Sequence, residues 1–158
     1  MPDKLVPINK IAALMKSLEK KGKSVVFTNG CFDLIHPGHI KLLKQAKKYG
    51  DILFLGINSD KSIRKIKGPS RPVMKEKERI TVLSAIEYID FISVFNEPTP
   101  IKLIEKIRPG ALVKGSDWPK SKIAGKEFVE SYGGKVFTIK LKPKISTSSL
   151  IKRILDNG

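Results

Sequence analysis

The sequence predicts a single doubly wound α/β domain. A five-stranded parallel sheet carries helices on both faces, and an extra helix precedes the first strand. Short apolar runs rich in β-branched residues alternate with amphipathic segments along the chain. Such alternation predicts a parallel sheet, because each crossover between parallel strands needs a helix and right-handed crossovers cover both faces. The chain has 158 residues, of which 41% are hydrophobic, so one domain can bury a core.

The predicted strands are short apolar runs that end in turn-forming or polar residues. In chain order they are "SVVFTNG" (24–30), "DILFLGINSD" (51–60), "DFISVFNE" (90–97), "ALVKGSD" (111–117) and "KVFTIKL" (135–141). Ligands of such sheets bind beyond the carboxyl ends of the strands. We therefore expect the segments that follow the strands to meet at one edge; these are "TNGCFD", "NSD", "NEPTP" and "KGSDW".

The predicted helices are the amphipathic segments around these strands. Pro37 can occupy the first turn of the second helix, and Gly50 ends it. In chain order the helices cover 7–21, 36–50, 75–89, 98–110, 122–134 and 146–155. The longest predicted loop is "IRKIKGPSRPVMKE", residues 63–76. We expect residues 1–23 to form an N-terminal helical extension and residues 24–158 to form the main domain.

The chain is strongly basic, with 31 Lys and Arg residues against 15 Asp and Glu residues and a formal net charge of +16. Such a charge attracts anions such as nucleotides, sugar phosphates, nucleic acid or an acidic membrane. The lysines are spread along the chain, without a zinc finger or an aromatic-rich surface on which bases could stack. We therefore predict a generally basic surface and no nucleic-acid or membrane partner.

The chain contains one cysteine, which excludes an internal disulfide and favours the reducing cytosol. It has no apolar run of about 18 residues that could span a membrane. The N-terminal residues also lack the pattern of a secretion signal. These observations together predict a cytoplasmic protein.

Both histidines and the only cysteine lie in "FTNGCFDLIHPGHIKLL", residues 27–43. A zinc site normally has three or four ligands, and here only Asp33 could join His36 and His39, so no protein metal site is expected. Cysteine and histidine can form a nucleophilic pair, but Cys31 is better explained by packing at the strand end or by its backbone N–H.

The pattern of this segment favours a phosphate site, although a structural pair of histidines is the alternative. A strand, a glycine turn and a helix start follow one another, and N–H groups at a helix start bind anions. Gly30 and Gly38 allow a ligand to approach the backbone closely. His36 and His39 would then lie beside the first helical turn, where imidazoles can bond phosphate oxygens and stabilise developing charge.

The segment "TNGCFDLIHPGHIKLLKQAKKYGD" resembles the first motif of the nucleotidyltransferase superfamily with the H-x-G-H signature. That superfamily has a Rossmann-like fold and includes class I aminoacyl-tRNA synthetases and the cytidylyl- and adenylyltransferases. Its second signature, a helix start rich in Ser and Thr, is similar to residues 146–148. The resemblance covers residues 8–155.

Further segments are similar to the adenylyltransferases of ADP-heptose synthesis. They are "GINSDKSIRKIKGPSRPV", "ALVKGSDW", "AGKEFVESYGGKV" and "ISTSSLIKRI". In the fused form of those enzymes, this domain follows a sugar kinase. The chain has Ser116, Trp118 and Ser148 where these enzymes usually have "VKGGDY" and "STT". Because "GDW" occurs in related cytidylyltransferases, this departure bears on the choice of nucleotide.

The resemblance implies that AMP is transferred from ATP to D-glycero-β-D-manno-heptose 1-phosphate, giving ADP-heptose and pyrophosphate by direct in-line attack. It also implies Mg²⁺ carried on the triphosphate, ATP and a sugar 1-phosphate as ligands, and a homodimer. By resemblance and position, the catalytic residues are His36, His39 and Lys114. The expected nucleotide-binding residues are Thr28, Asn29, Gly30, Cys31, Phe32, Gly38, Gly115, Asp117, Ser146, Thr147 and Ser148.

The expected acceptor-binding residues lie after the first two strands and in or beside the basic loop. They are Asp33, Asn58, Asp60, Lys67, Arg71 and Arg79. For several candidates a structural role remains open. Residues 146–148 can be an ordinary helix cap, Asp33 can organise its loop, and the basic side chains can simply be solvated.

Two other classes of function remain open. Within the same superfamily, the alternatives are a glycerol 3-phosphate or phosphoethanolamine cytidylyltransferase and an FMN adenylyltransferase. The alternative from a different class is a basic nucleotide- or nucleic-acid-binding module without catalysis. Such a module would bind nucleic acid in a salt-sensitive way and keep that binding without its histidines.

Overall fold

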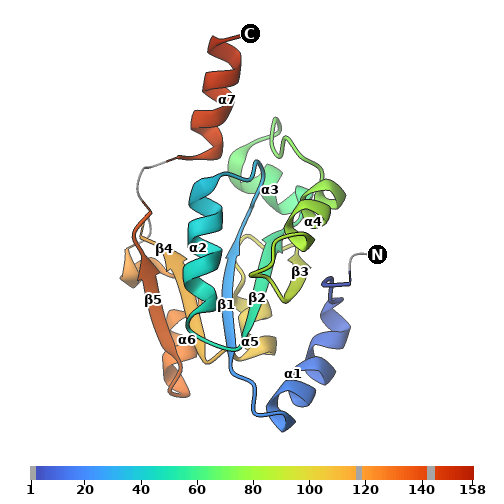
Figure 1. Cartoon of the computed structure of the whole chain (residues 1–158), viewed down its shortest axis with the longest axis vertical. Helices are drawn as coiled ribbons and strands as arrows, with labels where there is room; N and C mark the ends of the chain where they lie inside the picture. The colour runs from blue at the N-terminus through green and yellow to red at the C-terminus, as the bar shows by residue number, and fades with distance from the viewer. Residues whose placement is uncertain (1–2, 117–118, 142–144) are drawn as a thin grey trace.

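A computed structural model describes residues 3–116, 119–141 and 145–158. Its centre is a five-stranded, fully parallel sheet in the order β3-β2-β1-β4-β5 (Figure 1). The strands are β1 (Val25–Gly30), β2 (Ile52–Asn58), β3 (Phe91–Phe95), β4 (Ala111–Gly115) and β5 (Lys135–Ile139). The chain first winds outward from β1 to β3 and then returns to add β4 on the other side of β1. This order confirms the predicted doubly wound, Rossmann-like fold, with a crevice between β1 and β4.

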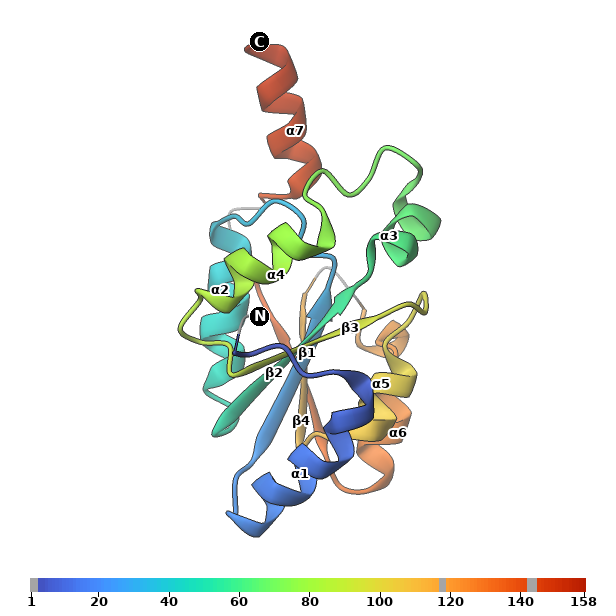
Figure 2. The same ribbon diagram turned by 90° about the vertical axis from the view of Figure 1, so that its right-hand side faces the viewer.

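Helices cover both faces of the sheet, as predicted. They are α1 (Ile11–Lys20), α2 (Pro37–Lys47), α3 (Asp60–Lys67), α4 (Glu76–Ser84), α5 (Ile101–Ile107), α6 (Lys126–Ser131) and α7 (Thr147–Asp156), with 3₁₀ turns η1 (Ile8–Lys10) and η2 (Lys120–Lys122). Figure 2 shows α2 and α4 on one side of the sheet and α1, α5 and α6 on the other. Each side has its own apolar cluster, one around Leu43 and Leu55 and the other around Phe27 and Phe54.

The segment after β2 differs from the sequence prediction. The strand ends at Asn58, and Asp60 begins α3 instead of ending the strand. The side chain of Ser59 caps this helix by accepting a hydrogen bond from the backbone N–H of Ser62 at 3.1 Å. Helix α3 ends at Lys67, before Gly68, whose φ of 98° suits glycine. The prediction of a loop is therefore wrong for residues 63–67, which belong to α3. The observed loop covers residues 68–75, between α3 and α4.

The N-terminal segment is joined to the sheet edge and to the core. The backbone of Ile92 in β3 donates to Lys4 O and accepts from the N–H of Val6, both at 2.8 Å. The side chain of Ile11 in α1 is fully buried in the same apolar cluster as Leu103 of α5. The domain boundary after residue 23 remains a prediction. Substitution of a residue that makes these contacts can test it.

Helix α7 projects from the rest of the chain in both views (Figures 1 and 2). Of its residues, Thr147 is buried, whereas the side chains of Ile154 and Leu155 are 65% and 73% exposed. Within the part of the chain that the structure describes, no helix has the length and apolar character needed to cross a bilayer.

Replacing Ile11 with alanine tests whether α1 belongs to the cooperative core. Because the side chain is fully buried, Ile11→Ala should lower the free energy of unfolding by about 3 kcal/mol in denaturant titrations. The exposed residue Lys20 of the same helix provides the control, since Lys20→Ala should change it by about 0.5 kcal/mol or less. An unchanged stability of Ile11→Ala would show that α1 unfolds independently.

Candidate functional site

A cleft of ≈ 270 Å³ lies at the carboxyl edge of the sheet. Most of its lining comes from the end of β1, α2, the end of β4 and the start of α7, and single residues at the end of α3 and after β5 complete it. The predicted site residues that line it are Asn29, Gly30, Cys31, Phe32, His36, His39, Lys67, Lys114, Gly115, Ser146, Thr147 and Ser148. The chain thus brings together residues from its first strand and its last helix.

The two histidines stack at the start of α2. Their ring centroids are 3.7 Å apart with an interplanar angle of 25°. His36 is the extended residue before the helix, and its carbonyl accepts a hydrogen bond from the N–H of His39 at 2.9 Å. A Cβ atom on Gly38 would lie 2.9 Å from His36 Cε1, closer than real contacts allow. The glycine of the H-x-G-H motif therefore makes room for the first imidazole.

The aromatic ring of Phe32 also packs against His39. The two ring centroids are 4.8 Å apart. Phe32 adopts a left-handed φ of 47°, which costs a non-glycine residue on the order of 1 kcal/mol. A Cβ on Gly30 would lie 2.9 Å from Phe32 Cε2, so this glycine also permits a close approach. Glycine and aromatic residues of the β1–α2 turn thus fix the position of His39.

Burial keeps both imidazoles neutral. It lowers the pKa of His36 below its ordinary value of 6.5. The pKa of His39 is lowered to about 3, mainly by burial and further by the neighbouring His36 and Lys67. The Nδ1 atoms of both rings are buried and have no hydrogen-bond partner among the described residues. The rings thus retain hydrogen-bonding capacity for a ligand without carrying a charge of their own.

Lys114 places an ammonium group at the floor of the cleft. Its Nζ donates a hydrogen bond to Asn29 O at 3.0 Å, which joins the ends of β4 and β1. Burial lowers the pKa of Lys114 to about 8, so the side chain is still mainly protonated at neutral pH. The cleft therefore contains a fixed cation next to two neutral imidazoles, which suits an anionic ligand.

The other two interpretations of the turn receive no support from this geometry. Burial raises the pKa of the Cys31 thiol, so at neutral pH it carries its proton and is a poor nucleophile. Among the residues described, no group of three or more His, Cys, Asp or Glu side chains is arranged to hold a metal ion.

Residues 146–148, at the start of α7, form a further part of the cleft wall. The hydroxyl of Ser146 accepts a hydrogen bond from the N–H of Ser149 at 3.1 Å and so caps α7. The capping role left open by the sequence is therefore present, and it is compatible with a ligand because Ser146, Thr147 and Ser148 all line the cleft. At a helix start, the first backbone N–H groups have no acceptor within the helix, so those not used by the cap can bind an anion.

Several predicted acceptor residues are bonded to the protein itself. The carboxylate of Asp33 accepts hydrogen bonds from Arg71 Nε and the N–H of Val73, both at 2.9 Å, and from the N–H of Met74 at 2.8 Å. Burial raises the pKa of Asp33, but these donors outweigh burial and the net pKa is lowered. Asp33 thereby organises the loop after α3, the alternative that the sequence left open.

Arg79 is fully buried and joins three segments below the cleft. Its Nη1 donates to Cys31 O at 2.7 Å and to Asn58 O at 2.9 Å, and its Nη2 donates to the carboxylate of Asp60 at 2.8 Å. Asn58 Nδ2 in turn donates to Ser62 Oγ at 3.0 Å. These side chains position the ends of β1 and β2. Of the predicted acceptor residues, Lys67 is the one that lines the cleft.

Two of the predicted nucleotide-binding residues that the structure describes, Thr28 and Gly38, do not line the cleft. Thr28 is fully buried within β1 and does not line the cleft. Asp117 lies outside the described residues. Sequence reasoning also missed the apolar walls formed by Leu42, Leu141 and Ile145. An apolar residue near a strand or helix end carries no specific signal, because the same residue type would serve the core.

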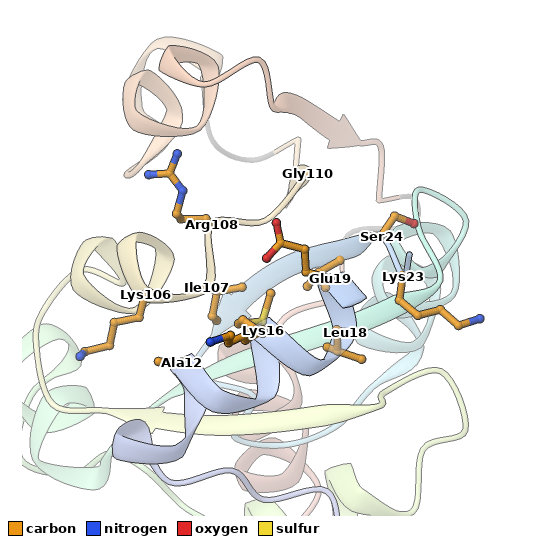
Figure 3. Close-up of a pocket in the computed structure, with 12 residues that line it drawn as sticks. Ala12, Lys16, Leu18, Glu19, Lys23, Ser24, Lys106, Ile107, Arg108 and Gly110 are labelled. Carbon is orange, nitrogen blue, oxygen red and sulfur yellow. The ribbon is translucent and has the colours of Figure 1, made fainter. Parts of the chain in front are cut away.

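A larger cavity of ≈ 650 Å³ lies away from these residues, between α1, the end of α5 and the start of β1. Its charged side chains come from separate segments, and Figure 3 shows Lys23 and Lys106 extending away from each other. The cavity lies at the amino end of β1, opposite the edge where doubly wound sheets bind ligands. We therefore place the functional site in the smaller cleft, where polar groups converge.

A doubly wound sheet with a stacked H-x-G-H pair, a lysine at the end of β4 and a hydroxyl-rich helix start defines a nucleotidyltransferase. The chain belongs to the cytidylyltransferase-like family, whose model matches residues 27–153. It is 54% identical over 137 residues to the bifunctional protein HldE of Syntrophotalea carbinolica, covering 87% of this chain and 28% of that protein. It is 45% identical over 152 residues to HldE of Geobacter metallireducens, covering 96% and 31%. The chain thus spans about a third of the length of these relatives.

The fold is also similar to a solved structure, a lipopolysaccharide core biosynthesis protein from Thermoplasma volcanium. The TM-score is 0.63 at 25% identity, over 78% of this chain and 100% of that chain.

Arg79 should be essential for the shape of the cleft floor. Arg79→Met leaves the carbonyl groups of Cys31 and Asn58 and one carboxylate oxygen of Asp60 without their guanidinium partner, so the free energy of unfolding should fall by about 3 kcal/mol in denaturant titrations. Lys77, an exposed residue of the same helix, supplies the control, and Lys77→Met should have an effect of about 0.5 kcal/mol or less. Equal stability of the two variants would show that the hydrogen bonds of Arg79 do not stabilise the strand ends.

His39 should remain neutral in the folded protein under mildly acidic conditions. Because its folded pKa of about 3 lies below 6.5, the unfolded chain binds a proton that the folded chain does not. This residue should therefore make stability fall as the pH drops from about 6.5 toward 3. In a titration followed by NMR, the His39 ring signals should show no protonation between about pH 8 and pH 5. A midpoint near 6.5 would contradict the burial argument.

Proposed function

We propose that the protein transfers AMP from ATP to D-glycero-β-D-manno-heptose 1-phosphate, releasing pyrophosphate and forming ADP-heptose. The observation that carries the proposal is the stacked pair of His36 and His39 facing the same cleft as the start of α7 and Lys114. The relatives named HldE and the segments similar to the adenylyltransferases of ADP-heptose synthesis support the choice of acceptor.

The reaction is a single displacement at the α-phosphorus of ATP. An oxygen of the sugar phosphate forms a bond to this phosphorus while the bond to the β-phosphate breaks, and pyrophosphate leaves on the opposite side. No covalent bond to the protein is needed. Catalysis then consists of aligning two anions that repel each other and stabilising the charge that moves to pyrophosphate.

The residues of the cleft can serve these two purposes. The rings of His36 and His39 donate hydrogen bonds to the triphosphate in their neutral form, so they need not be protonated first. The N–H groups at the starts of α2 and α7 add partial positive charge, and the Ser148 hydroxyl lies on the same wall. Lys114 supplies a full charge near the reacting phosphate.

We propose that Mg²⁺ enters with ATP. The described residues of the cleft offer imidazoles, hydroxyls, amides and ammonium groups, whereas Mg²⁺ prefers carboxylate, phosphate and water oxygens. The nearby carboxylate of Asp33 is committed to Arg71 and two backbone N–H groups. This donor set fits a metal held by phosphate oxygens and water, which would neutralise charge on the triphosphate.

We also propose a homodimer that works in the cytosol. The exposed Ile154 and Leu155 of α7 support self-association, because contiguous exposed apolar residues commonly mark interfaces. A single cysteine in 158 residues favours a reducing compartment.

A panel of nucleotides and acceptors tests the proposal. Pyrophosphate release with Mg²⁺ should occur with ATP, not CTP, GTP or UTP, and should require the heptose 1-phosphate. Reaction with CTP and glycerol 3-phosphate or phosphoethanolamine, or with ATP and FMN, would instead identify one of the related transferases. Salt-sensitive nucleic-acid binding without any transfer would identify a non-catalytic module.

The histidines should be required for rate and not for folding. His36→Ala and His39→Ala should each lower kcat by about 100-fold to 1000-fold, because each removes hydrogen bonding to charge that develops in the transition state. The matched control is Lys41→Ala, an exposed position of the same helix, where kcat should stay within about twofold. Wild-type rates in both histidine variants would contradict the catalytic role proposed for His36 and His39.

A further inference from the structure

The cavity of ≈ 650 Å³ between α1, the end of α5 and the start of β1 has no part in the proposed transfer reaction. We call it the amino-edge cavity. The cleft lies where β1 ends, whereas this cavity lies where β1 starts, so the two are at opposite edges of the sheet. A molecule bound in the amino-edge cavity would therefore leave the cleft open to its substrates.

The floor of the amino-edge cavity is apolar. It is formed by Ala12, Met15, Leu18, Val25 and Ile107. Ala12 is exposed and Met15 is half-buried, so α1 offers apolar surface to a bound molecule. The volume of the cavity lies within the range of about 300 to 1,000 Å³ that is common for ligand sites. Several apolar side chains of a ligand therefore have room on this floor.

The rim of the cavity is cationic. Its basic residues are Lys16, Lys23, Lys106 and Arg108, and all four are exposed. Among the described residues that line the cavity, Glu19 is the only acidic one. Figure 3 shows Lys23 and Lys106 extending away from each other at two ends of the cavity. Cations that diverge in this way cannot converge on one small anion, but they suit carboxylates that are spaced along a chain.

Arg108 is held on the rim in an unfavourable backbone conformation. It follows the last residue of α5 with a left-handed φ of 48°, where glycine is the usual residue. Its guanidinium lies 4.4 Å from the ring centroid of Tyr132 and 5.6 Å from that of Phe128. The hydroxyl of Tyr132 donates a hydrogen bond to Pro109 O at 2.8 Å, which fixes the ring. The aromatic rings thus position the guanidinium at the cavity.

The guanidinium of Arg108 is available to a ligand. The side chain is exposed and forms no ion pair within the described part of the chain. Stacking on a ring uses the face of the guanidinium and leaves its in-plane N–H groups free to bond a carboxylate in a bidentate manner. Because no ion pair within the chain offsets the strain at Arg108, the strain points to a ligand.

The floor and the rim together select the kind of ligand. A second copy of this chain matches poorly, because its exposed helix α7 carries Lys152 and Arg153, which the cationic rim would repel. Nucleic acid matches the charge, but its bases bind by stacking on aromatic rings, and no described residue that lines the cavity is aromatic. An acidic protein segment with apolar side chains matches both the floor and the rim.

We propose that the amino-edge cavity is a docking site for an acidic segment of another protein. Apolar side chains of that segment, one helical turn apart, enter between α1 and α5, and its carboxylates bond Arg108, Lys106 and Lys23. The inference goes beyond the proposed transfer reaction and does not depend on it, because the cavity and the cleft share no described lining residue.

Fluorescence anisotropy with a defined peptide tests this docking site. The probe is a labelled peptide of about twelve residues, with leucines one helical turn apart and glutamate at the other positions. Ala12→Glu places a negative charge on the floor, and Arg108→Asn removes a cation from the rim. Each should raise the Kd at least about tenfold. Asparagine tolerates a left-handed φ, so Arg108→Asn keeps the local backbone conformation.

Two matched controls change the same charge outside the cavity. Ala13→Glu and Lys20→Asn alter exposed positions of α1 that do not line it, and the Kd should stay within about twofold. Changes in the peptide separate charge from apolar contact. Replacing its glutamates with glutamine, or its leucines with serine, should each raise the Kd at least about tenfold.

The other outcomes would overturn the docking site. They include no binding of the peptide to the wild type, and equal affinity for Ala12→Glu and Ala13→Glu. A single-stranded oligonucleotide that binds more tightly than the peptide, and loses this binding in Arg108→Asn, would assign the cavity to nucleic acid. Self-association of the wild type that Ala12→Glu abolishes in sedimentation equilibrium would assign it to a second copy. Pyrophosphate release does not enter these measurements, so failure of the transfer reaction leaves their result intact.

Discussion

The site depends on the close approach of the His36 ring to the start of α2, which only a glycine at position 38 permits. A side chain there would meet His36 Cε1 at 2.9 Å. With the ring in place, His39 stacks on it with the ring centroids 3.7 Å apart, and the ring of Phe32 packs against His39 as well. Two imidazoles in contact cannot easily both carry charge, because like charges at this distance repel strongly. The same packing that positions the rings therefore keeps them neutral.

The chain has a net charge of +16, but the two imidazoles of the cleft are neutral, so surface charge and the groups of the cleft act differently on an anionic ligand. The many surface lysines attract anions over a distance, but salt screens them and they do not fix the geometry of a ligand. The geometry of a ligand is instead fixed by groups that the fold holds in place at the cleft: two neutral rings, the half-buried side chain of Lys114 and the N–H groups at two helix starts. Arg79 holds the strand ends beneath them by binding the carbonyls of Cys31 and Asn58. Long-range attraction and local alignment are thus provided by different residues.

Sequence reasoning predicted the sheet, the H-x-G-H helix and the joining of residues 146–148 to the first turn, because each has a periodic or motif signal. It missed α3, where the cap at Ser59 was hidden in an apparent strand end. It also assigned Arg79 and Asp33 to the acceptor, since a charged residue near a site looks the same in sequence whether it binds a ligand or, as here, backbone groups and an oppositely charged side chain of the protein.

The stereochemistry of transfer tests the central claim most directly, namely that the acceptor displaces pyrophosphate from ATP in one step, without a covalent bond to the protein. The substrate would be ATP with one sulfur at a defined position on its α-phosphorus, and the configuration of the sugar nucleotide product would be determined. A single in-line displacement inverts the configuration at phosphorus, and inversion is the result that this account predicts. Retention would require two displacements and a covalent intermediate on the protein, and it would contradict the account.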